Sequence, residues 1–280
     1  MPTGAGFPIR SKMALTQITA ARLLLVELLE FPDPFAGERF REAKFLDVHF
    51  RSKDVLKSNG VAFDELQRFK RPTDPPDTAS LCFNLATTVN PAKNLSPAHE
   101  YFHLIQYGVS YYKNSWYTEG TARWSEAGLG TGSVGGSKAD AGNVDAGKLA
   151  AAEANASRPG AAWPENDEQR ETLFRRRYDA AEFFWNVLAQ EHDEGNGELP
   201  SSPELVQLQN MRYADGTPVL RDSRFSGHRF IRQVLLELGR ADDVTFRERG
   251  YDRWSEANQF SSQNSPDILE AVRRAARLEP

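Results

Sequence analysis

The sequence predicts an α+β fold with a small N-terminal sheet and a mainly helical C-terminal part. Apolar residues alternate with a period of two in residues 44–50, which indicates a half-buried strand. Through most of the second half they recur at helical spacing instead. A chain of 280 residues can bury a sizeable core, so one two-lobed unit is expected.

Charge and hydropathy exclude two classes of partner. The 39 acidic and 34 basic residues give a net charge of -5, which provides no basic field for nucleic acid. No run of about 18 apolar residues occurs, so no membrane span is expected. Residues 14–31 carry charged and polar groups and form an amphipathic helix rather than a signal peptide. The default location is therefore cytoplasmic, and export by a signal-independent route remains open.

The cysteine count limits the kinds of metal site. Cys82 is the single cysteine, which excludes an internal disulfide and any cysteine-rich zinc site. Any bound metal must therefore be held by histidine and carboxylate side chains.

Five elements are expected before residue 90. A helix over 14–29 ends at the prolines that follow it, and residues 44–50 form the first strand. Residues 61–69 suggest a short helix, and 71–77 form an extended proline-rich loop. A second strand is expected over 78–88.

The central region changes to a helical period at Ser96, a plausible N-cap followed by Pro97 in the first turn. This helix should run to about Tyr107, where Gly108 can end it. A second helix is expected from about Tyr117 to Gly128.

Helices dominate the remainder of the chain. Residues 128–160 consist mainly of small and polar residues and should form a surface loop or linker. Helices are expected over 167–191, 229–238 and 266–278.

Three segments follow from this order. Residues 1–130 form an N-terminal lobe with the sheet and two site-bearing helices, 131–166 a Gly/Ala-rich loop, and 167–280 a helical C-terminal lobe. A cleft is expected between the lobes.

The helix from Ser96 carries the sequence His99-Glu100-Tyr101-Phe102-His103. Histidines four residues apart project from one helix face and can share one zinc ion at about 2.0–2.1 Å. Glu100 stands beside them, where it can take a proton from a water molecule at the metal. The alternative is a pair of ordinary histidines on an amphipathic helix.

A catalytic zinc site needs a third protein ligand and one open position. Glu119 is the candidate, since it lies on the next predicted helix and its neighbours Gly120 and Ala122 permit close helix packing. An exposed carboxylate near a helix start is the alternative for Glu119, and Glu126 is the substitute ligand.

These two segments resemble a known family. HEYFHLIQYG from His99 and WYTEGTARWSE from Trp116 are similar to the gluzincin metallopeptidases, and to bacterial peptidases with HExFHxxQ and EGTA-x-W-x-E patterns. The segment YDAAEFFWNVL over 178–188 is similar to the helix that follows in those proteins. The resemblance implies a zincin-like fold, bound Zn²⁺ and hydrolysis of peptide bonds in a peptide or protein substrate.

Carried over by position, the resemblance makes His99, His103 and Glu119 the zinc ligands and Glu100 the general base. The sequence departs from thermolysin-like enzymes at Arg123, where they have an aspartate that orients a histidine ligand. Orientation of the histidines must then come from another residue, for which Glu126 is suggested.

The expected reaction also needs a donor for the oxyanion. The candidates are Tyr178, then Tyr112, then His228, and Tyr178 also fits a packing role on the face of Phe184 and Trp185. His228 is otherwise expected at the surface. The strand over 78–88 is placed like the zincin edge strand that pairs with an extended substrate.

Two other functions are compatible with the motif. One is a non-catalytic, zinc-stabilised module for protein interaction. The other is a peptide deformylase with Cys82 as a ligand, which the surroundings of Cys82 disfavour because no glutamate and glycine precede it. Cys82 then becomes a small buried hydrophobe. His49 and His192 are expected to be structural or solvated. The sequence does not specify the substrate or the oligomeric state.

Overall fold

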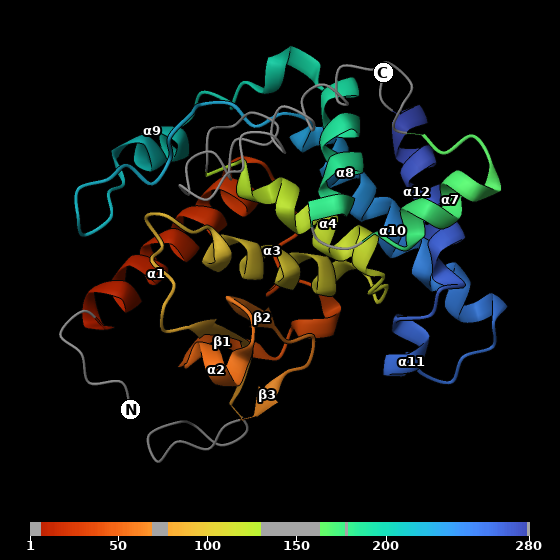
Figure 1. Cartoon of the computed structure of the whole chain (residues 1–280), viewed down its shortest axis with the longest axis horizontal. Coiled ribbons are helices and arrows are strands. Elements are labelled where there is room, and N and C mark those ends of the chain that lie inside the picture. Colours follow the sequence, from red (N-terminus) through yellow and green to blue (C-terminus); the bar gives the residue numbers. More distant parts are fainter. Residues whose placement is uncertain (1–6, 69–77, 130–162, 177–178, 279–280) are drawn as a thin grey trace. The chain divides into compact units, whose positions relative to one another are not determined.

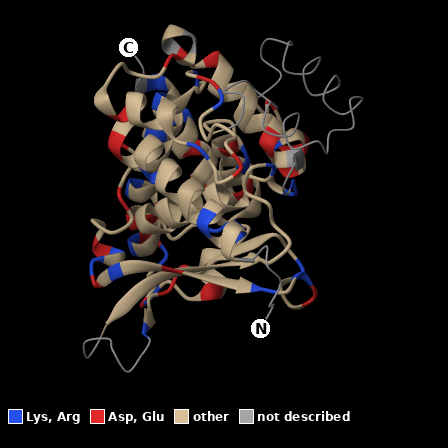
Figure 2. Cartoon of the chain, turned by 90° about the vertical axis from the view of Figure 1, so that its left-hand side faces the viewer, with Lys and Arg blue, Asp and Glu red and all other residues tan. Residues whose placement is uncertain are grey.

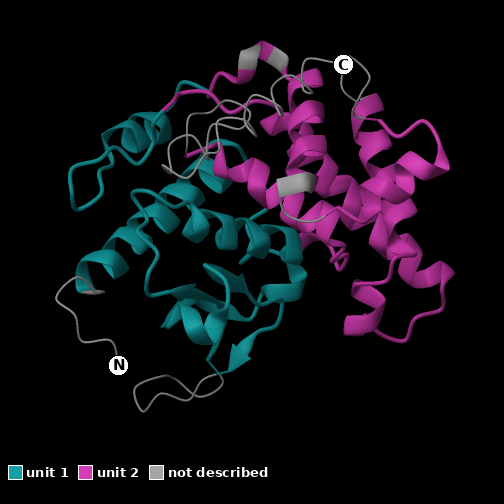
Figure 3. Cartoon of the chain, in the orientation of Figure 1, with its two compact units in different colours: residues 1–108, 200–221 teal, residues 109–199, 222–280 magenta. Residues whose placement is uncertain are grey.

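The computed structural model describes residues 7–68, 78–129, 163–176 and 179–278. They belong to two compact units, which Figure 3 colours separately. Unit 1 comprises residues 1–108 and 200–221, and unit 2 comprises 109–199 and 222–280. The helix that carries Glu119 thus belongs to unit 2. The loops expected over 71–77 and 128–160 lie largely or wholly outside the described residues.

Unit 1 begins with a partly buried helix. α1 (Phe7–Arg22) continues directly into a π-helical turn, η1 (Leu23–Leu28). The helix expected over 14–29 is therefore present, although it begins earlier and widens in its last turn. Leu24 and Leu25 are almost fully buried there, and α9 (Pro203–Asn210) packs against η1. The apolar turn η1 thus packs the N-terminal helix against α9, which lies far away in the sequence.

The sheet of unit 1 has four strands. β1 (Ala43–Arg51) pairs in parallel with β4 (Ala79–Ala86), and β2 (Gly60–Ala62) and β3 (Gln67–Arg68) pair antiparallel with β4. Both predicted strands are confirmed. The helix expected over 61–69 is wrong, because the described part of this segment pairs with β4. The backbone groups of these residues form their hydrogen bonds with β4, and a local sequence pattern does not reveal such a distant partner.

β4 lies inside the sheet, so its assignment as an edge strand is wrong. It has β1 on one side and both β2 and β3 on the other, and its residues are almost all buried. A near-continuous apolar strand is typical of a central position covered on both faces. β2, which pairs only with β4 among the described strands, is an edge.

One face of the sheet is apolar. The β1–β4 register places Leu46 beside Leu81, Val48 beside Phe83 and Phe50 beside Leu85. In Figure 1, helix α3 (Ser96–Val109) lies alongside this sheet. The predicted helix over 96–107 is confirmed, and its packing explains why Phe102 and Ile105 are fully buried.

The other helices of unit 1 are short. η2 (Glu38–Phe40) precedes β1, and α2 (Lys53–Leu56) follows it.

Apart from loops and an isolated β-bridge between Glu198 and Arg224, the described part of unit 2 is made of helices. They are α4 (Ser115–Glu126), α7 (Asp167–Phe174), α8 (Asp179–Glu191), η3 (Glu194–Gly197), α10 (His228–Glu248), α11 (Glu256–Gln259) and α12 (Asn264–Leu278). The expectation of one helix over 167–191 is wrong, since α7 and α8 are separate. The helices expected near 117–128, 229–238 and 266–278 are confirmed as α4, α10 and α12.

Charged residues of both signs are interspersed along the ribbon in Figure 2. None of the described helices has the length and apolar character needed to cross a membrane.

Candidate metal centre

α3 carries both histidines on the same face. His99 and His103 are 7% and 4% exposed, and their rings meet edge to face with centroids 4.7 Å apart. One helical turn separates their Cα atoms, which is the spacing that brings i and i+4 side chains together. The predicted juxtaposition of the two imidazoles is therefore present within unit 1.

The orientation of His103 is fixed by a neighbour on the same helix. Its Nδ1 lies 2.7 Å from Oε1 of Gln106. An amide oxygen only accepts hydrogen bonds, so Nδ1 carries the proton and Nε2 keeps its lone pair. The ring of Tyr107 stacks on His103 with centroids 5.6 Å apart and planes 5° apart. Gln106 thus selects the tautomer in which Nε2 can bind a metal ion.

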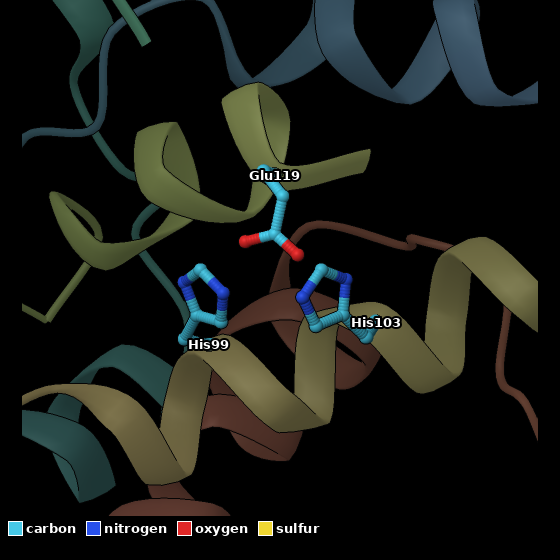
Figure 4. A group of neighbouring side chains, drawn as sticks. All are labelled: His99, His103 and Glu119. Atoms are coloured by element: carbon cyan, nitrogen blue, oxygen red, sulfur yellow. The ribbon is translucent and has the colours of Figure 1, made fainter. Parts of the chain in front are cut away.

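Glu119 on α4 completes a set of three potential ligands. His99, His103 and Glu119 each offer one ligand atom, and these atoms lie within 4.8 Å of one another. Figure 4 shows both imidazole rings and the carboxylate directed toward one another. Zinc binds nitrogen and carboxylate oxygen at about 2.0–2.2 Å, so atoms this close together are compatible with one shared ion. This is the only such group among the described residues.

Glu100 is buried beside the histidines, with 5% of its surface exposed. Its side chain lies against the backbone of β2 at Gly60. A Cβ atom placed on Gly60 would be 2.3 Å from Oε1 of Glu100 and 2.5 Å from its Cγ. The carboxylate therefore occupies the space that any side chain at position 60 would need.

The N-terminal end of α3 is held by a buried glutamine from α1. Oε1 of Gln17 accepts the backbone N–H of Ala98 at 3.1 Å, and Nε2 donates to the carbonyl of Pro91 at 2.7 Å. The same amide nitrogen lies 3.2 Å from the Asn94 carbonyl and 2.8 Å from the Tyr213 hydroxyl. Gln17 is fully buried, so these bonds replace contacts with water. The turn before His99 is thereby tied to the core of unit 1.

The other end of α3 is held by an arginine. Nη1 of Arg39 donates to the backbone carbonyl of Tyr107 at 2.8 Å, and Nη2 contacts Oδ2 of Asp64 at 2.6 Å. The carbonyls of a helix's last turn have no partner within the helix, and a cation there is favoured by the helix dipole. Asp64 follows β2, so Arg39 connects the end of α3 to the strand that contacts Glu100.

α4 is positioned by aromatic packing within unit 2. A Cβ on Gly120 would lie 2.3 Å from Cδ1 of Trp185 on α8, so this indole lies directly against the helix that carries Glu119. Trp185 stacks on Trp116, with centroids 5.7 Å apart, and its Nε1 donates to the Trp116 carbonyl at 2.7 Å. The absence of a side chain at Gly120 thus brings α4 and α8 together one residue beyond Glu119.

Glu126 has a defined partner on its own helix. Its Oε1 accepts a hydrogen bond from Nη1 of Arg123 at 2.8 Å, and its side chain is buried. Arg123 stands where thermolysin-like enzymes have an orienting aspartate, and Glu126 was suggested to replace that aspartate. The two residues are therefore paired with each other. The support observed for His103 comes from Gln106.

The three candidate oxyanion donors have different positions. Tyr178 lies outside the described residues. The Tyr112 hydroxyl is buried and 2.6 Å from Oγ1 of Thr245. Burial raises the pKa of Tyr112, with the Thr245 hydrogen bond opposing the shift.

His228 is buried at the start of α10, so its expected surface position is wrong. Its ring stacks on Phe225, with centroids 6.5 Å apart. Burial, together with the nearby charge of Arg229, lowers the pKa of His228 to about 4, although the charge of Asp193 opposes the shift. The neutral imidazole is consequently its state near pH 7.

Cys82 is the small buried residue that the sequence suggested. It lies in β4 and is 2% exposed, and burial raises the pKa of its thiol to about 11. It does not belong to the ligand group of His99, His103 and Glu119. His49, on β1, lies 3.2 Å from the Asp47 carboxylate. His192 stacks on Phe230, with centroids 4.5 Å apart.

Sequence reasoning missed Gln106 and Gly60 beside the site, as well as Gln17 at the start of α3. Gln106 follows His103 by three residues on a helix, and this spacing alone could have identified it as an orienting group. Gly60 had no such local signal, because its role depends on strand pairing. The chain matches no protein-family profile, no curated protein and no solved structure.

Proposed function

We propose that this protein is a zinc-dependent peptidase of the gluzincin type. The observation that carries the proposal is the group of His99, His103 and Glu119, two imidazoles and one carboxylate with their ligand atoms within 4.8 Å. This donor set is typical of catalytic zinc sites, which use three protein ligands and leave a further position open. Glu100, adjacent to a ligand and buried, is the base in this proposal.

The surroundings of the ligands support zinc binding. The hydrogen bond between His103 Nδ1 and Gln106 Oε1 favours the tautomer whose Nε2 carries the lone pair that a metal ion requires, as expected for a metal-binding histidine. A bound zinc ion would lower the pKa of a water molecule and polarise the scissile carbonyl. Glu100 would accept the proton from the attacking water and deliver it to the leaving nitrogen.

β2 supplies an edge that suits an extended peptide. The Asn59 carbonyl accepts from the N–H of Ala86, and the N–H of Phe63 donates to the Cys82 carbonyl. In an antiparallel pair every second residue faces its partner, so Gly60 and Ala62 turn their backbone groups away from β4. A substrate strand could pair with these outward groups beside Glu100. The proposed substrate is therefore a peptide or protein segment in extended form.

Zinc content tests the ligand set. Purified wild-type protein should hold about one zinc per chain after dialysis, and Glu119→Ala should hold much less. Glu171→Ala, an exposed glutamate on α7, is the control and should retain wild-type content. Absence of zinc from wild type after reconstitution would contradict the proposal. Loss of zinc in Glu126→Gln but not in Glu119→Ala would make Glu126 the third ligand.

Turnover tests the role of Glu100. Glu100→Gln should retain zinc and lose peptidase activity, because an amide of the same shape cannot accept the proton. Cleavage of a mixture of unstructured peptides, followed by mass spectrometry, provides the assay without a known substrate. Full activity in Glu100→Gln would rule out this residue as the base.

The burial of the histidines also favours a second function, a non-catalytic zinc-stabilised module. His99 and His103 are each more than nine-tenths buried, and structural zinc sites are closed, with no position open to a substrate. In that case zinc removal should lower the unfolding midpoint strongly, and Glu100→Gln should change neither zinc content nor any cleavage activity.

A further inference from the structure

We infer that Gly60 is a positioning residue for Glu100, fixing the carboxylate by excluding a side chain from the strand beside it. The inference rests on the proposed function insofar as Glu100 is the base. The contact between Gly60 and Glu100 lies within unit 1, and it can be tested by unfolding measurements that require no enzymatic activity.

The contact is closer than any side chain would allow. A Cβ on Gly60 would lie 2.3 Å from Oε1, 2.5 Å from Cγ and 2.6 Å from Cδ of Glu100. The conflict therefore extends along the side chain from Cγ to the carboxylate oxygen. An alanine at position 60 could not be accommodated by rotating the carboxylate alone. It would displace the whole end of Glu100 or push β2 away.

The glycine is not explained by the backbone conformation, since Gly60 does not have the positive φ that favours glycine elsewhere in the chain. Gly60 pairs with Leu85 of the apolar sheet face, so its missing side chain would point toward α3. The small residue is thus required by the proximity of Glu100.

Hydrogen bonds hold β2 in place beside Glu100. Its flanking residues are hydrogen-bonded to β4 through the Asn59 carbonyl at 2.8 Å and the Phe63 N–H at 3.0 Å. The Gly60 carbonyl also accepts a hydrogen bond from the Ser58 hydroxyl at 2.8 Å. Arg39 joins Asp64, just beyond β2, to the last turn of α3. The strand is therefore bonded to β4 on both sides of Gly60, and Arg39 links its far end to α3.

Fixing Glu100 matters because a general base must lie within hydrogen-bond distance of the proton that it removes. A displacement of about 1 Å can lower turnover by about 100-fold. Gly60 would act only through Glu100, since it contributes no side chain.

A double-mutant cycle on unfolding tests the contact. Gly60→Ala should lower the unfolding midpoint by several degrees in wild type, and by about 1 °C or less when Glu100→Ala removes the carboxylate. The Glu100→Ala background is the matched control, because replacing Gly60 by alanine reduces the flexibility of the unfolded chain equally in both backgrounds. Equal shifts in both backgrounds would overturn the inference.

Turnover tests the positioning role. Gly60→Ala should retain zinc and KM while kcat falls by about 100-fold. In the Glu100→Asp background, whose shorter side chain leaves room for the new methyl group, Gly60→Ala should lower kcat much less. Val55→Ala, an exposed residue of α2, is the activity control. An unchanged kcat in Gly60→Ala would overturn the role. If Glu100→Gln retains full activity, the proposed function fails, whereas the unfolding cycle still tests the contact.

Discussion

The helices that carry the candidate ligands are held in place by different kinds of interaction. α3 is held at both ends by polar side chains, Gln17 at its start and Arg39 at its last turn. α4 instead packs through indole rings, with Gly120 directly against Trp185. Both helices bury most of their residues. Burial alone therefore does not determine how a helix responds to substitution.

The difference predicts different sensitivities. A buried amide that makes several hydrogen bonds cannot be replaced by an apolar residue of the same size without leaving its partners unpaired. An aromatic contact depends on volume and shape, so removing the ring creates a cavity. α3 should consequently be sensitive to loss of single polar atoms, and α4 to loss of volume.

The largest effect is expected from Trp185→Ala. Removing this fully buried indole should lower the free energy of unfolding by about 3–5 kcal/mol, because the cavity on α4 cannot close completely. Chemical denaturation measures the change. Trp185→Phe is the matched variant, since it keeps a ring but removes the Nε1 hydrogen bond to the Trp116 carbonyl. If both variants lose the same stability, the hydrogen bond matters more than the volume of the ring. The proposal that α4, unlike α3, depends on packing would then be contradicted.

The aromatic surroundings of α4 also predict a dependence on pH. Phe225 stacks on both Trp124 and His228, and burial lowers the pKa of His228 to about 4. The unfolded chain, with a histidine pKa near 6.5, binds this proton more readily than the folded chain. Stability is therefore fully present above about pH 6.5 and is lost as the pH falls toward 4, by up to about 3 kcal/mol.

The measurement compares wild type with His228→Leu, which has no titrating group at this position. The difference between their unfolding free energies should change across pH 6.5 to 4, because all other groups titrate in both proteins. A difference that stays constant over this range would mean that His228 does not remain neutral in the folded protein.

Gln17→Met should have the next largest effect, on α3. Methionine has a similar size but leaves the Ala98 N–H, the Pro91 carbonyl and the Tyr213 hydroxyl without the glutamine amide. The expected loss is about 2–3 kcal/mol in the free energy of unfolding. Thr19→Ala, an exposed position on α1, should change stability by less than about 0.5 kcal/mol. A loss in Gln17→Met no larger than that would contradict polar anchoring of α3.

Much of the fold was predictable because the relevant signals are local. The alternation in 44–50 and the helical spacing around His103 specify β1 and α3 without reference to distant residues. The segment 61–69 was misread since the conformation of its described part comes from pairing with β4, which follows later in the chain. The same reason explains why β4 was expected at an edge, as strand order is not encoded within a strand.

The candidate site divides in a similar way. His99, Glu100 and His103 lie within one helical turn, so their spacing predicted their juxtaposition. Glu119 was suggested by its place on the next predicted helix and by the resemblance, while Glu126 stayed an alternative, because the packing of two helices cannot be read from one of them. Gly60 and Gln17 were not predicted, since each acts through contacts with residues far away in sequence.

Gln106 provides the smallest effect and the sharpest test of polar control in α3. In Gln106→Ala, His103 Nδ1 loses the acceptor that lies 2.7 Å away, so the tautomer that presents Nε2 is no longer selected. Zinc affinity should fall by about 10- to 100-fold, measured by competition with a chelating dye. Gln106→Glu keeps an oxygen that can accept the Nδ1 proton and should retain the affinity. If Gln106→Ala binds zinc as tightly as wild type, orientation of His103 comes from the stacked Tyr107 ring instead.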